Sequence, residues 1–162
     1  MNWDAAGAIG EIVGAVAVLA TLLYLAKQIR QSNQFSIASN EISIRDSFGR
    51  INEALYGDTE LARITTLAMN SDMKFEDIDY TRYLAFLRQC INTWLSIEKA
   101  YENGMTSKET YNVIFDDVEW FVREFPAGRY IMRELLNTYS AHTDSRLFSA
   151  LKESLDRHES IV

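Results

Sequence analysis

The sequence predicts an all-α protein in which one N-terminal transmembrane helix continues into a cytosolic helical bundle. An apolar stretch near the N-terminus is long enough to cross a bilayer, and later segments repeat apolar residues at helical spacing without the period-two alternation of strands. The 162 residues are 48% hydrophobic and include one proline, which favours an ordered, helix-rich chain. We expect a transmembrane helix with its flanks at 1–30, a helical neck at 31–57 and a cytosolic helical domain at 58–162.

The apolar segment from Ala5 to Ala26 has the length of a membrane span. As a helix it rises roughly 33 Å, at about 1.5 Å per residue, against about 30 Å of hydrocarbon core. A secretory signal peptide fits poorly, because no base precedes Lys27 and no small-residue cleavage site follows a short apolar core. A buried core helix is the other interpretation, since only Ile12–Ala26 runs without any charge.

The basic residues predict the orientation of this segment. Lys27 and Arg30 follow it directly, whereas no Lys or Arg precedes it. The positive-inside rule therefore places the long C-terminal part in the cytoplasm and the short N-terminus outside. The single cysteine, Cys90, excludes an intrachain disulfide and fits a reducing compartment; its apolar surroundings predict an inert core thiol.

One face of the apolar segment repeats small or polar residues. When the helix is projected at about 100° per residue, they fall within roughly 60° of a common line. We call this set the small-residue seam: Gly7, Gly10, Gly14, Ala17, Thr21, Tyr24 and Gln28. Glycines let two helices approach closely in lipid, so the seam predicts a homo-oligomer, although Gly and Ala also occur by chance in spanning helices. The opposite face carries residues suited to lipid: Ile12, Leu19, Leu22 and Leu23.

Glu11 is the one carboxylate between Gly7 and Ala26, and it lies next to the seam. An ionised carboxylate that faces lipid costs a few kcal/mol, so intramembrane acids usually face protein or water. Three interpretations are open. Glu11 reaches the outer headgroups, or hydrogen-bonds across a helix–helix contact, or lines a pore in which a ring of glutamates attracts cations.

The neck is expected to continue the same helix. Serines follow the seam at steps of four, three and four residues, and a separate apolar stripe is expected to pack on the rest of the domain. The serines are Ser32, Ser36, Ser39 and Ser43, and the apolar residues are Ile37, Ile44, Phe48, Ile51 and Leu55. Because serine is a poor helix former, a break at Gln31–Ser36 is the alternative.

The later helices have clear boundaries in the sequence. Asp58 precedes a short helix, and a long one ends before Gly104, the expected C′ glycine. Thr106–Glu109 reads as a capping box that starts a helix running to Phe125, before Pro126. Two more helices follow in AGRYIMRELLNTY and SRLFSALKESLDRHES. Two stripes are interpreted as core rather than cofactor pocket: Tyr83, Phe86, Leu87, Ile91 and Trp94, then Phe115, Val118, Phe121 and Val122.

Composition and motifs argue against several classes of function. The net charge is −7, and residues 27–162 contain 21 of the 23 acidic residues and all 16 basic ones. Nucleic acid is therefore not an expected partner, because phosphate binding needs clustered Lys and Arg. Phosphate-loop, dinucleotide and serine-hydrolase motifs are missing, and we expect neither an enzyme nor a cofactor. Five acids on two predicted helices are interpreted as a solvated face and not as a metal site: Glu98, Glu102, Asp116, Asp117 and Glu119.

One pair of cations suggests an anion site. In FPAGRYIMRE, Gly128 opens a helix, and Arg129 and Arg133 stand one turn apart. A helix N-terminus with two guanidiniums suits a lipid phosphate, a nucleotide or a carboxylate of a partner. The alternative is surface ion pairing with Glu124 and Glu134.

Three segments resemble a recurring group of small, uncharacterised bacterial membrane proteins. NWDAAGAIGEIVGAVAV…LLYLAKQIRQ is similar to the group's Trp, G-x-I-G-E-I-V-G, apolar run and Y-L-A-x-Q-I-R exit. WLSIEKAYENGMTSKETY looks like its E-x-x-Y-x-x-G segment, and FPAGRYIMREL like P-G-G-R-x-x-W, with Ala127 and Met132 as departures. The resemblance is strong in residues 3–31 and looser afterwards. It implies a one-span helical protein of the bacterial inner membrane with a Glu at position 11, and implies no reaction.

These observations predict a single-pass, self-associating membrane protein with a cytosolic helical interaction or sensing domain. Its expected partners are the lipid bilayer and further copies of itself, with a cytosolic partner or small ligand of unknown identity. The alternative is a homo-oligomeric ion channel with Glu11 near its outer mouth. In either case the residues expected to mediate oligomerisation or line a pore are Gly7, Gly10, Glu11, Gly14, Ala17, Thr21 and Gln28.

Overall fold

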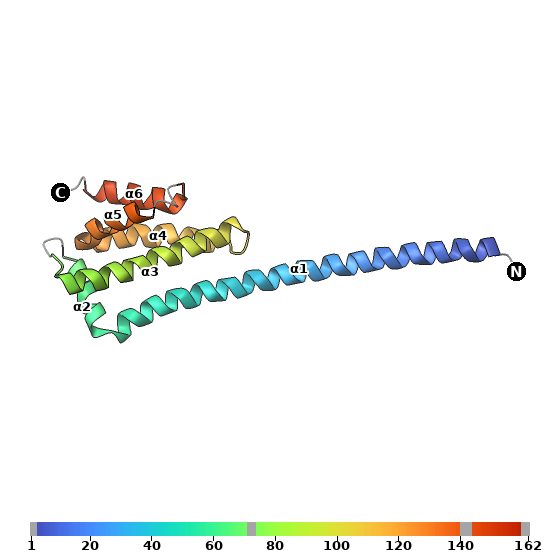
Figure 1. Ribbon diagram of the computed structural model, residues 1–162, viewed down its shortest axis with the longest axis horizontal. Coiled ribbons are helices and arrows are strands. Elements are labelled where there is room, and N and C mark those ends of the chain that lie inside the picture. The colour runs from blue at the N-terminus through green and yellow to red at the C-terminus, as the bar shows by residue number, and fades with distance from the viewer. Residues whose placement is uncertain (1–2, 71–73, 140–143, 160–162) are drawn as a thin grey trace. The chain divides into compact units, whose positions relative to one another are not determined.

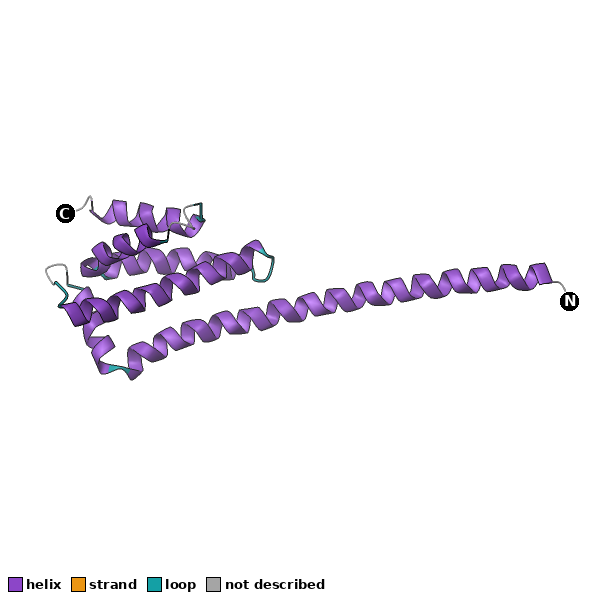
Figure 2. Ribbon diagram, viewed as in Figure 1, coloured by secondary structure: helices purple, strands orange, loops and turns teal. Residues whose placement is uncertain are grey.

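The computed structural model describes residues 3–70, 74–139 and 144–159, which form helices joined by short turns, without a strand (Figures 1 and 2). The prediction of an all-α chain is therefore confirmed. The elements in order are α1 (Trp3–Gly57), α2 (Thr59–Ala68), α3 (Asp77–Glu102), α4 (Lys108–Glu124), the 3₁₀ turn η1 (Pro126–Gly128), α5 (Arg129–Thr138) and α6 (Arg146–Glu159).

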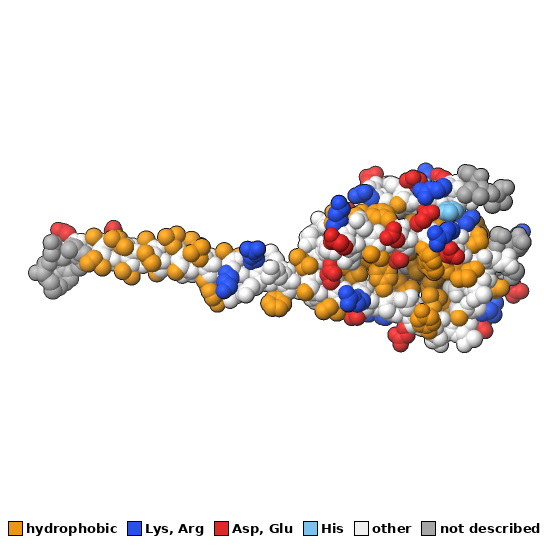
Figure 3. Space-filling view, turned by 180° about the vertical axis from the view of Figure 1, so that it is seen from behind, with side chains coloured by type: hydrophobic (Ala, Val, Ile, Leu, Met, Phe, Trp, Pro, Cys, Tyr) orange, Lys and Arg blue, Asp and Glu red, His pale blue; other side chains and the backbone are white. Residues whose placement is uncertain are grey.

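The chain divides into two compact units, Met1–Ser39 and Asn40–Val162. The first unit is the N-terminal part of α1. This helix is continuous through Gln31–Ser36, so the alternative of a break is wrong. Successive i to i−4 hydrogen bonds bridge the serine-rich stretch because neither a proline nor a glycine interrupts it. Hydrophobic side chains cover its N-terminal portion on the face shown in Figure 3.

The second unit is a helical domain with one core. In it α4 packs against α6 and α3, while α5 contacts α3 and α6 (Figure 1). The two apolar stripes expected to form the core are buried, except that Phe115 is only partly buried. Cys90 is buried among them, as predicted for a core thiol, and burial raises its pKa to about 12. Twelve larger side chains have almost no exposed surface, Trp94 and Tyr83 among them.

The C-terminal part of α1 belongs to this second unit and packs on it through the predicted apolar stripe, except for Ile37, which is exposed and lies in the first unit. Ile44 and Ile51 are buried, and Phe48 and Leu55 are partly buried against the core. Polar contacts add to this packing near the start of the unit. The Asn40 side-chain amide donates to the Met105 carbonyl oxygen over 2.9 Å.

The helix ends confirm most of the predicted boundaries and correct one. The Asp58 carboxylate caps α2, and Gly104 follows α3 with a φ of 66°, in the left-handed region that favours glycine. The predicted capping box at Thr106 is wrong. Ser107 caps α4 by accepting the Thr110 amide, while the Thr106 hydroxyl donates to the Glu41 carboxylate of α1.

Candidate functional site

The N-terminal part of α1 is apolar and unburied. It is the one helix, among the described residues, that is long and apolar enough to cross a membrane, and none of its 18-residue apolar window is buried. A core helix of a soluble domain would bury this face, whereas Leu23, for example, is 73% exposed. By length and composition, this segment could therefore span a membrane.

The small-residue seam lies open along this part of the helix. A Cβ added at Gly7, Gly10 or Gly14 would meet no atom within 4 Å. The polar members bond locally, because the Thr21 hydroxyl donates to the Ala17 carbonyl and the Gln28 amide donates to the Tyr24 hydroxyl, each over 2.8 Å. The seam thus exposes backbone and small side chains. The hydroxyl donor of Thr21 is already used within its own helix.

Glu11 is exposed and has no hydrogen bond or ion pair within the part of the chain that the structure describes. Its neighbours along the helix are apolar or glycine. In a bilayer such a carboxylate requires water, a headgroup or a partner helix. The three interpretations of Glu11 are still predictions.

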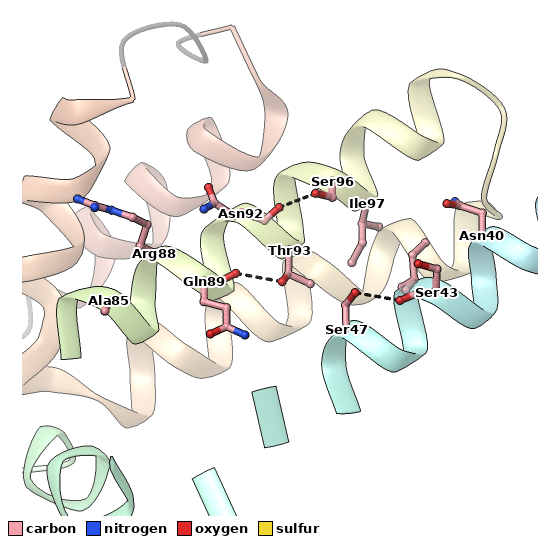
Figure 4. Close-up of a pocket in the computed structure, with 11 residues that line it drawn as sticks. Asn40, Ser43, Ser47, Ala85, Arg88, Gln89, Asn92, Thr93, Ser96 and Ile97 are labelled. Atoms are coloured by element: carbon pink, nitrogen blue, oxygen red, sulfur yellow. Dashed lines mark hydrogen bonds between the residues drawn. The ribbon is translucent and has the colours of Figure 1, made fainter. Parts of the chain in front are cut away.

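A polar groove lies between the C-terminal part of α1 and α3, entirely within the second unit (Figure 4). It encloses about 500 Å³. Its lining residues are Asn40, Ser43, Ile44 and Ser47 from α1, and Ala85, Arg88, Gln89, Asn92, Thr93, Ser96 and Ile97 from α3. Most of them carry uncharged polar or small side chains, and Arg88 is the single charged one.

The hydroxyl groups of the groove are oriented by their own helices. Ser47, Thr93 and Ser96 each donate to the carbonyl oxygen four residues earlier, as the dashed lines in Figure 4 show. The Ser47 oxygen also accepts from Arg50 over 3.1 Å, and the Asn40 and Asn92 amides already bond to Met105 and Tyr139. The groove therefore offers the remaining hydroxyl acceptors, the Gln89 amide and one cation. Of the α1 serines in this groove, Ser43 was predicted from the sequence as one of the serines that follow the seam and Ser47 was not, and neither was the α3 wall. The signal was a run of uncharged residues at steps of three and four from Ala85 to Ser96.

Arg129 and Arg133 are both engaged within the protein, but not with the partners considered from the sequence. Arg129 donates from Nε to the Val122 carbonyl over 2.8 Å and from Nη1 to the His158 carbonyl over 3.1 Å. It therefore holds the C-terminal end of α4, whose last carbonyls lack helical partners. Arg133 pairs with Asp156 over 2.9 Å. Gly128 ends the turn η1, and the two guanidiniums do not converge on one anion.

The expectation that the five acids form a solvated face is wrong for Glu98, which is buried. Its carboxylate accepts the Leu147 amide over 3.2 Å and the Ser145 hydroxyl, so a residue of α3 caps the N-terminus of α6. Glu119 is half-buried; hydrogen bonds from His158 and Ser154 lower its pKa. Among the described residues no group of His, Cys, Asp and Glu is placed to hold a metal ion.

Fold and site together define a class: an all-α chain with one N-terminal helix able to cross a membrane and a helical domain after it. Comparisons of the chain with protein-family models, curated proteins and solved structures give no match. The resemblance to small bacterial membrane proteins is therefore still a prediction.

Proposed function

We propose that the protein is a single-pass, self-associating protein of the bacterial inner membrane, with its N-terminus outside and a cytosolic helical interaction or sensing domain. The observation that carries the proposal is the apolar window of α1, none of which is buried, followed by Lys27 and Arg30. A bilayer removes these side chains from water, and the two bases stay at the cytoplasmic headgroups.

The energetic argument favours insertion over exposure to water. Large apolar side chains such as Ile12, Leu19 and Leu22 are more than half exposed in the isolated chain. Full burial of each contributes about 1.5–3 kcal/mol, so a segment with several of them gains far more than the few kcal/mol that Glu11 costs.

Self-association follows from the seam. Gly10 and Gly14 stand four residues apart with open space above both, which lets a second helix approach backbone to backbone. Dispersion and close helix contact then drive association, since lipid tails provide no hydrophobic force between helices. The polar groove begins where the neck joins the second unit and provides further small and uncharged surface for a partner.

Cell fractionation tests the location. We expect the full-length chain in the inner-membrane fraction, resistant to alkaline carbonate, with a C-terminal fluorescent reporter active in the cytoplasm. A tag at the N-terminus should be accessible from outside the membrane. Recovery of the wild type as a monodisperse soluble protein without detergent would contradict the proposal, because the unburied segment would then be tolerated in water or covered by other copies.

Bulky substitutions in the seam test the assembly. Gly10→Ile and Gly14→Ile should each weaken self-association in detergent, because a branched side chain replaces backbone contact. Leu19→Ile, on the predicted lipid face, is the matched control and should leave the oligomer unchanged. Molar mass of the solubilised protein from light scattering is the readout. The same oligomer in all three variants would exclude the seam as the contact.

A further inference from the structure

A second pocket lies between α5 and α6. It encloses about 480 Å³ and is lined by Arg133, Leu136 and Asn137 from α5 and by Phe148, Ser149 and Lys152 from α6. Each set occupies one face of its helix, at steps of one, three or four residues. We call this the α5–α6 pocket. Its volume is within the usual range for small-molecule sites, roughly 300–1,000 Å³.

The α5–α6 pocket combines apolar and polar lining residues. Phe148 is 8% exposed and Leu136 is partly buried against the core, so their lining surfaces are rigid and apolar. Ser149 does not compete for a ligand as a donor, because its hydroxyl donates to the Ser145 carbonyl oxygen over 3.2 Å. Arg133 is fixed by its 2.9 Å ion pair with Asp156.

Two polar groups at the pocket are unused. The Lys152 ammonium and the Asn137 amide have no hydrogen bond or ion pair with any residue that the structure describes. The lining set contains no carboxylate and two cations; Asp156 neutralises Arg133, so Lys152 supplies the charge that is not offset, in a chain with a net charge of −7. A local positive potential against an apolar wall selects an anion with an apolar body.

We propose that the α5–α6 pocket binds a small amphipathic anion, such as a carboxylate with a short hydrocarbon part. The hydrocarbon lies on Phe148 and Leu136, and the carboxylate meets the Lys152 ammonium and the Asn137 amide. Arg133 also lines the pocket, but Asp156 offsets its charge. The proposed anion site thus differs from the one predicted at Arg129 and Arg133, since Lys152 belongs to α6. This site would define the class of ligand that the proposed sensing domain binds. The inference rests on the proposed function to that extent.

The test uses three probes of equal chain length: hexanoate, hexanol and hexylamine. Binding to the full-length protein in nanodiscs of neutral lipid is measured by ligand-observed NMR, with empty nanodiscs as background. We expect hexanoate to bind at least about fivefold more tightly than hexanol, because the alcohol gains only the apolar contact. Hexylamine should bind most weakly. Equal affinities for hexanoate and hexylamine, or no hexanoate binding up to tens of millimolar, would overturn the proposal.

Charge-matched variants locate the site. Lys152→Met keeps the apolar stem and should lower hexanoate affinity about five- to tenfold while leaving hexanol unchanged. Lys108→Met removes the same charge from an exposed position of α4 and should change neither. Ser149→Phe should fill the pocket and weaken both probes. Wild-type hexanoate affinity in Lys152→Met would place the binding elsewhere.

A last arm separates two sources of the anion. If nanodiscs that contain an anionic lipid abolish hexanoate binding, the physiological ligand is a lipid headgroup; if they do not, it is a free molecule. Either result agrees with an anion site. Failure of the proposed function is distinguishable, since a full-length chain that carbonate extracts can be assayed for hexanoate binding without nanodiscs.

Discussion

Replacing Gly128 with alanine is expected to destabilise the helical domain. The cause is a steric clash of the added methyl group with Tyr83, and not strain in the backbone. Gly128 has φ −86° and ψ −9°, which alanine adopts without strain. A Cβ built on it, however, would overlap the hydroxyl oxygen of Tyr83 and lie 2.5 Å from its Cε1. Tyr83 is fully buried, so its ring has no free space into which to withdraw.

The size of the effect follows from two opposing terms. Forcing an extra methyl group into a packed core costs about 1–3 kcal/mol. Alanine recovers about 0.4–1 kcal/mol by restricting the unfolded chain. We therefore expect Gly128→Ala to lose about 1–2 kcal/mol, a shift of about 0.5–1 M in the urea midpoint. Tyr83→Phe should be as stable as the wild type or more so, because the buried Tyr83 hydroxyl has no hydrogen-bond partner among the described residues.

A double-mutant cycle with Tyr83→Leu isolates the contact. Leucine lacks the atoms nearest the added Cβ, so the loss caused by Gly128→Ala should shrink by about 1 kcal/mol or more in that background. Tryptophan fluorescence of the full-length protein in detergent, followed through a urea titration, provides the stabilities; Trp94 lies in the core. Additive effects in the cycle, or a Gly128→Ala variant as stable as the wild type, would refute this reasoning.

Three further predictions concern single carboxylates. Glu98→Ala should cost about 2–3 kcal/mol in the same titration, because it strands the buried Leu147 amide; an unchanged midpoint would argue against the cap. The Ser107 amide donates to the Glu41 carboxylate and lowers its pKa. The stability that this hydrogen bond adds is complete above the ordinary glutamate pKa and is lost as pH falls through the lowered pKa. Glu41→Gln should therefore make the urea midpoint fall less steeply on the acid side. Glu11→Leu should weaken self-association whereas Glu11→Gln preserves it, if the carboxylate bridges helices; lower cation selectivity of Glu11→Gln in liposome flux would indicate a pore instead.

Local signals in the sequence were sufficient for most of the fold. Helical periodicity identified the core stripes, and Asp58 and Gly104 marked helix ends because a cap depends on residues within a turn or two. The same reasoning failed at Thr106. Its hydroxyl donates to Glu41, a partner 65 residues earlier, and Ser107 takes the capping role. No local pattern contains that partner.

The candidate sites also differ in how far the sequence could predict them. The apolar window and the seam are properties of one helix, so the sequence displayed them directly. The polar groove and the α5–α6 pocket each combine two helices, and their composition appears only when Arg88 or Lys152 is placed beside the facing helix. Glu98 looked like part of a solvated face because its partner at Leu147 is 49 residues away.

Structural roles explain the motif residues in the two later segments that carry the resemblance. A function is therefore more to be expected at residues that packing does not explain. Within the E-x-x-Y-x-x-G segment, Glu98 caps α6, the Tyr101 ring stacks on Tyr111 at 4.3 Å, and Gly104 turns the chain. In the FPAGR segment, the absence of a Cβ at Gly128 makes room for the Tyr83 ring, and the Arg129 side chain caps the C-terminal end of α4. Packing therefore accounts for these residues without a ligand. Packing does not account for the exposed carboxylate at position 11, or for the lysine beside an apolar wall at position 152, which has no partner among the described residues. These are the places where substitutions should alter function while the fold persists.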